Sequence, residues 1–169
     1  MFGLSHRMQV LATIGLIVVF FAFLARLDFV LVARECFDGV YYHLGIIDVN
    51  AQWFWMWFVG YPVFGLVFSF TYYAGALDTE RNLVYALGIF ATVILFAVGQ
   101  LEDFFWTIVN PEVSAIGLFD DWSVWGWSAE NNFCYMLCGG WNNFLHYVWL
   151  ACFVAVVAAM WCLIFREYD

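Results

Sequence analysis

Four long uncharged runs alternate with short polar segments along the chain. They cover residues 8–25, 50–77, 82–101 and 131–165, and Gly139-Gly140 divides the last of them. A helix needs about 20 apolar residues to cross about 30 Å of hydrocarbon. The pattern therefore predicts an all-α integral membrane protein with a single domain, residues 1–169. We expect four transmembrane helices in an antiparallel bundle, over about residues 8–34, 51–77, 80–108 and 141–166.

Two of the predicted helices carry signals for an irregular backbone. Pro62 lies inside the second span, and we expect a kink near Tyr61 because proline lacks a backbone donor and clashes with the preceding turn. The third helix, if it continued from residue 82 to 109, would be about 42 Å long at 1.5 Å per residue. Because this exceeds the hydrocarbon thickness, its far end should either protrude or break near Gln100.

The connection between the last two predicted spans, residues 110–140, is acidic and aromatic. It includes Trp122, Trp125 and Trp127 among its carboxylates and has no Arg or Lys. Its aromatic content argues against disorder, which requires low hydrophobicity. We therefore expect an ordered lid at the membrane surface.

Composition strengthens the membrane assignment and limits the partners. Apolar residues make up 66% of the chain and charged residues 11%, against roughly 25% charged in soluble domains. The net charge is −9 and Lys is absent. Binding to phosphate backbones needs a basic patch, so nucleic acid is excluded as a partner. The surroundings that the composition predicts are membrane lipid.

The arginines predict an orientation. If the helices alternate in direction, Arg7, Arg81 and Arg166 fall on one side and Arg34 on the other. By the positive-inside rule, both termini are then cytoplasmic. Loops 35–50 and 110–140 would lie on the outer side.

Several ionisable residues are predicted to share one depth. Counting about 20 residues across the membrane from each cytoplasmic boundary reaches Arg26, Asp28, Glu102, Asp103 and His146. They would form a polar layer at the outer edge of the hydrocarbon. Ionisable groups at such depth are costly and usually face a bundle interior or a partner. The layer is therefore the place where the sequence points to function.

Three interpretations of this layer remain open. The first is a divalent-metal site for Fe, Mn or Zn, which carboxylates and imidazoles suit; its candidate ligands are Glu35, Asp38, His43, Glu102, Asp103 and His146. The second is structural, with ion pairs among Arg26, Asp28 and Glu102, and with His146 hydrogen-bonded to Asn142 or a backbone carbonyl. The third is binding of a polar ligand headgroup, or a carboxylate–histidine proton relay.

The cysteines divide into two groups. Cys152 and Cys162 fall in the last helix and are interpreted as small packing residues. Cys36, Cys134 and Cys138 are predicted on the outer side, which is oxidising in most cells. A disulfide from Cys36 to Cys134 or Cys138 would attach the lid to the first helix.

Two functions fit these observations. The first is a small, non-catalytic subunit of a larger membrane complex, whose partners are other membrane chains or further copies of itself. The second is a membrane-embedded enzyme that depends on a metal or a carboxylate and acts on a lipid or a quinone. An enzyme should show a pocket that opens between helices beside Glu102 and His146.

Overall fold

The computed structural model describes residues 5–28, 56–75, 79–109 and 143–168. Within these ranges the backbone is almost entirely helical and has no strand, which confirms the predicted all-α class. The elements are α1 (His6–Asp28), the π-helical turn η2 (Met56–Gly60), α4 (Tyr61–Gly75), α5 (Thr79–Val98), α6 (Leu101–Val109) and α9 (Asn143–Tyr168).

Three of the helices are long and apolar enough to cross a membrane. The qualifying segments are His6–Leu27, Arg81–Val98 and Phe144–Tyr168, and they support the membrane assignment. The predicted second span corresponds to η2 and α4, and α4 has 15 residues. The fourth span, and with it the antiparallel four-helix bundle, stays a prediction.

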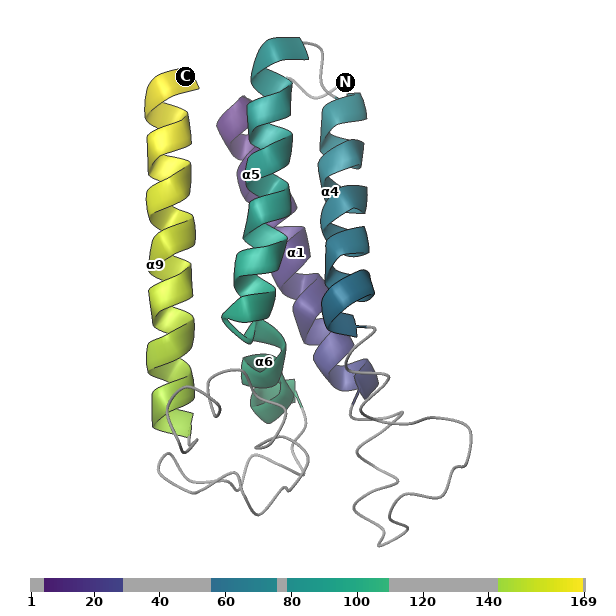
Figure 1. The fold of residues 1–169 in the computed structure, drawn as a ribbon, viewed down its shortest axis with the longest axis vertical. Coiled ribbons are helices and arrows are strands. Elements are labelled where there is room, and N and C mark those ends of the chain that lie inside the picture. Colours follow the sequence, from purple (N-terminus) through teal and green to yellow (C-terminus); the bar gives the residue numbers. More distant parts are fainter. Residues whose placement is uncertain (1–4, 29–55, 76–78, 110–142, 169) are drawn as a thin grey trace, which may run out of the picture.

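Helix α5 is the centre of the structure. It packs against α4, α9 and α1, while α6 packs mainly against α1. Figure 1 shows α5 between α9 and α4, with α1 crossing behind it. The core that these helices enclose is apolar and aromatic, and Ile17, Phe21, Tyr85 and Ile89 are among its fully buried members.

An aromatic cluster joins four helix ends. The Nδ1 atom of His6 lies 3.3 Å from the Tyr72 hydroxyl, and the His6 ring stacks on Tyr85 at 5.6 Å. The guanidinium of Arg7 lies 5.4 Å from the centre of the Phe165 ring. The start of α1 therefore meets the end of α4, the start of α5 and the end of α9. This brings the arginines of these segments to one end of the molecule, as the charge pattern predicts; their cytoplasmic location stays a prediction.

Polar side chains form hydrogen bonds between α5 and its neighbours α4 and α9. Ser69 Oγ of α4 donates to the carbonyl of Ala86 at 2.8 Å. Trp161 Nε1 of α9 donates to Thr92 Oγ1 at 2.9 Å, and that hydroxyl donates to the Gly88 carbonyl at 2.8 Å. In hydrocarbon such bonds between helices contribute to association, because lipid supplies no hydrophobic driving force between them.

The irregular positions fall where the sequence signals them. The third predicted helix breaks at residues 99–100 instead of protruding as one rod, so it forms α5 and α6. Before Pro62, the π-helical turn η2 replaces a regular α-helical turn, and α4 begins at Tyr61; a bend of the helix axis there stays a prediction. Residues 29–34, 51–55 and the predicted lid over 110–140 lie outside the described residues.

Candidate functional site: a polar layer at a broken helix

The polar layer is built around the interruption between α5 and α6. Helical hydrogen bonds end with Gly99 N–H donating to Leu95 and Gln100 N–H donating to Ala97, both at 2.8 Å. Gln100 then has φ 60°, in the left-handed region that non-glycine residues seldom adopt. Helix α6 restarts when Phe104 N–H donates to the Gln100 carbonyl at 3.1 Å. A break of this kind removes helical partners from nearby carbonyls, and lipid offers no replacement for them.

Helix α9 supplies side-chain donors to this break. Trp149 Nε1 donates to the Val98 carbonyl at 2.8 Å. His146 Nε2 lies 2.9 Å from the Gln100 carbonyl, and because a carbonyl oxygen only accepts, Nε2 carries the hydrogen. The two donors are three residues apart, so they lie on one face of α9. The side chains of α9 therefore stabilise the broken backbone that they face.

A second contact connects α4 to α6. The Tyr61 hydroxyl donates to Glu102 Oε2. Both side chains are buried, with 2% of Tyr61 and 5% of Glu102 exposed, and the Phe21 ring of α1 stacks on Tyr61 at 5.5 Å. The carboxyl group is thus enclosed where α1, α4 and α6 meet. The hydroxyl hydrogen bond satisfies a buried carboxyl oxygen that would be costly to leave without a donor.

Some residues of the predicted polar layer lie at this break. His146 is fully buried and Glu102 nearly so, whereas Asp103 is half-buried and Arg26 is exposed at the end of α1. For His146, the backbone-carbonyl alternative of the structural interpretation is confirmed. The side chain of Asp28 lies outside the described residues. The ion pairs among Arg26, Asp28 and Glu102 stay a prediction.

Two members of the site were not singled out by the sequence. The sequence pattern marks Tyr61 only as the position of a kink, and it does not mark Trp149. Trp149 carried a usable signal, because it stands three residues after His146 on the same helix face. No sequence signal identifies Tyr61 as the partner of Glu102, because the two residues lie 41 positions apart.

The metal and disulfide predictions fall largely on residues that the structure does not describe. Among those it does describe, no three His, Cys, Asp or Glu side chains are grouped as metal ligands. Glu35, Asp38 and His43 lie outside the described ranges, as do Cys36, Cys134 and Cys138. The metal site and the disulfide therefore stay predictions. Cys152 and Cys162 are free thiols on the exposed side of α9.

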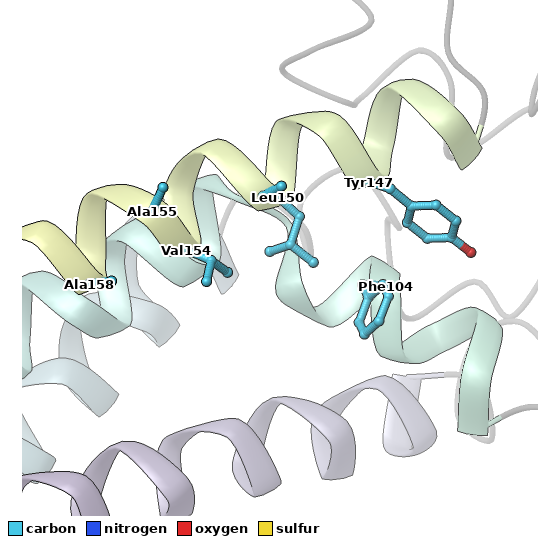
Figure 2. Close-up of a pocket in the computed structure, with 7 residues that line it drawn as sticks. Phe104, Tyr147, Leu150, Val154, Ala155 and Ala158 are labelled. Atoms are coloured by element: carbon cyan, nitrogen blue, oxygen red, sulfur yellow. The ribbon is translucent and has the colours of Figure 1, made fainter.

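An apolar groove runs beside the layer. It has a volume of about 380 Å³ and lies against α6 and α9, with a lining of Phe104, Tyr147, Leu150, Ala151, Val154, Ala155 and Ala158. Figure 2 shows Leu150 and Val154 pointing from α9 into the space that faces α6 and α1. Neither Glu102 nor His146 lines this groove.

Comparisons with known proteins found no relative, so the site is interpreted from its own residues. No family model matches the sequence, and neither the curated proteins nor the solved structures gave a match. In the described site, the Tyr61 hydroxyl binds Glu102 and the His146 Nε2–H binds a backbone carbonyl. These groups thus hold helices together.

Proposed function

We propose that this chain is a non-catalytic subunit of a larger membrane complex, in which its polar layer holds its own helices in register. One observation carries the proposal: two buried polar side chains of the layer, Glu102 and His146, bind other parts of the same chain. Tyr61 binds Glu102 across α4 and α6, and His146 binds the Gln100 carbonyl across α9 and the break.

The apolar lining of the groove, as far as the structure describes it, supports the same proposal. An enzyme site combines an apolar pocket with a few polar groups that point into it. Among the residues that the structure describes, the groove beside α6 and α9 is lined by Phe104, Tyr147 and five aliphatic residues, without a carboxylate or imidazole. Of the described residues that line it, Tyr147 alone carries a polar side-chain group.

The outer surfaces of the long helices leave room for partner chains. In their most apolar stretches, 28% of the α1 residues and 17% of the α9 residues are buried inside the described structure. The remaining faces carry large apolar side chains, among them Leu16, Phe23 and Leu163. Such faces can pack against other transmembrane helices as well as against lipid.

An enzyme that depends on a metal or a carboxylate is the second candidate. The burial of Glu102 favours it, because an ionisable residue inside a membrane segment is costly and often functional. Elemental analysis of protein purified without chelators tests it directly. Near-stoichiometric Fe, Mn or Zn that is lost in Glu102→Ala and His146→Ala variants of intact fold would support this candidate, and a metal-free wild type would refute its metal-dependent form.

The subunit proposal is tested by comparing the chain in its native membrane with the chain expressed alone. After mild-detergent extraction, the native form should run as a larger particle with defined companion chains in fixed proportion. The chain expressed alone should be less stable to heat. Glu102→Gln should preserve the native particle, because the glutamine oxygen can still accept from Tyr61. A monodisperse, equally stable isolated chain, with no companions in the native membrane, would overturn the proposal.

A further inference from the structure

We draw no further inference here: the strongest candidate, the apolar groove beside α6 and α9, lies open on the surface, and nothing in the described part of the chain shows what covers it.

Discussion

The contact between Tyr61 and Glu102 makes the most direct test of a structural polar layer. Tyr61→Phe removes the hydroxyl that donates to the buried carboxyl group and leaves the ring in place against Phe21. A buried donor or acceptor that loses its partner costs about 1–3 kcal/mol in proteins. Between membrane helices, side-chain hydrogen bonds average about 0.6 and reach about 1.7 kcal/mol. The two ranges overlap at about 1.5 kcal/mol, which is the expected loss in the free energy of unfolding.

A double-mutant cycle isolates this contact from the other interactions of the two residues. The variants are Tyr61→Phe, Glu102→Met and the pair of substitutions together, and the coupling between them should be about 1 kcal/mol because methionine removes the acceptor. Unfolding is followed by helical circular dichroism as the fraction of denaturing detergent in mixed micelles rises. Tyr73→Phe is the matched control on the same helix, because 41% of Tyr73 is exposed. It should change the free energy of unfolding by less than about 0.5 kcal/mol.

Two outcomes would contradict a stabilising contact between Tyr61 and Glu102: a cycle without coupling, and a Tyr73→Phe protein destabilised as much as Tyr61→Phe. The first outcome would mean that the contact between α4 and α6 does not stabilise the fold. The second would mean that loss of any tyrosine hydroxyl from α4 has the same effect.

Three further substitutions test the packing around the site by the same unfolding assay. Gly88→Ala would place a methyl group 2.9 Å from Trp161, whose ring is held by a hydrogen bond. The expected loss is about 1–3 kcal/mol, and an unchanged stability would contradict the close approach. Gly15→Ala has no described atom within 4 Å of the new methyl group. It should stabilise the helix by about 0.5–1 kcal/mol, and a loss would show a neighbour at that face. Trp149→Phe should cost about 1–3 kcal/mol by leaving the Val98 carbonyl without its donor, and a neutral result would mean that another donor replaces it.

Much of the fold follows from the solvent that the chain requires. Hydrocarbon accepts only long apolar segments with an internally bonded backbone, so the runs of uncharged residues locate the helices. The same rule explains why α1 and α9 begin within a few residues of their predicted positions, at His6 and Asn143. It also placed Glu102 and His146 near one depth, since depth depends on the number of residues counted from a boundary.

The sequence alone did not determine whether the third predicted helix protrudes from the membrane or breaks. Its length exceeds the membrane, and either protrusion or a break near Gln100 satisfied that constraint. The tertiary structure decided for a break, because α9 brings Trp149 to the Val98 carbonyl and His146 to the Gln100 carbonyl as a second donor. A left-handed residue inside a membrane helix is stable only when such donors lie close by.

The partners in the site were likewise decided only by the tertiary structure. Composition along a helix gives the depth of Glu102, but its partner depends on how far each helix is rotated about its axis. The rotation turns Tyr61 of α4 towards the carboxyl group. In the same way, His146 faces a backbone carbonyl, a group that every residue carries and that no sequence pattern marks. The sequence by itself therefore determined the membrane environment and the depth of the polar residues, whereas the helix rotations and the released backbone groups determined what those residues bind.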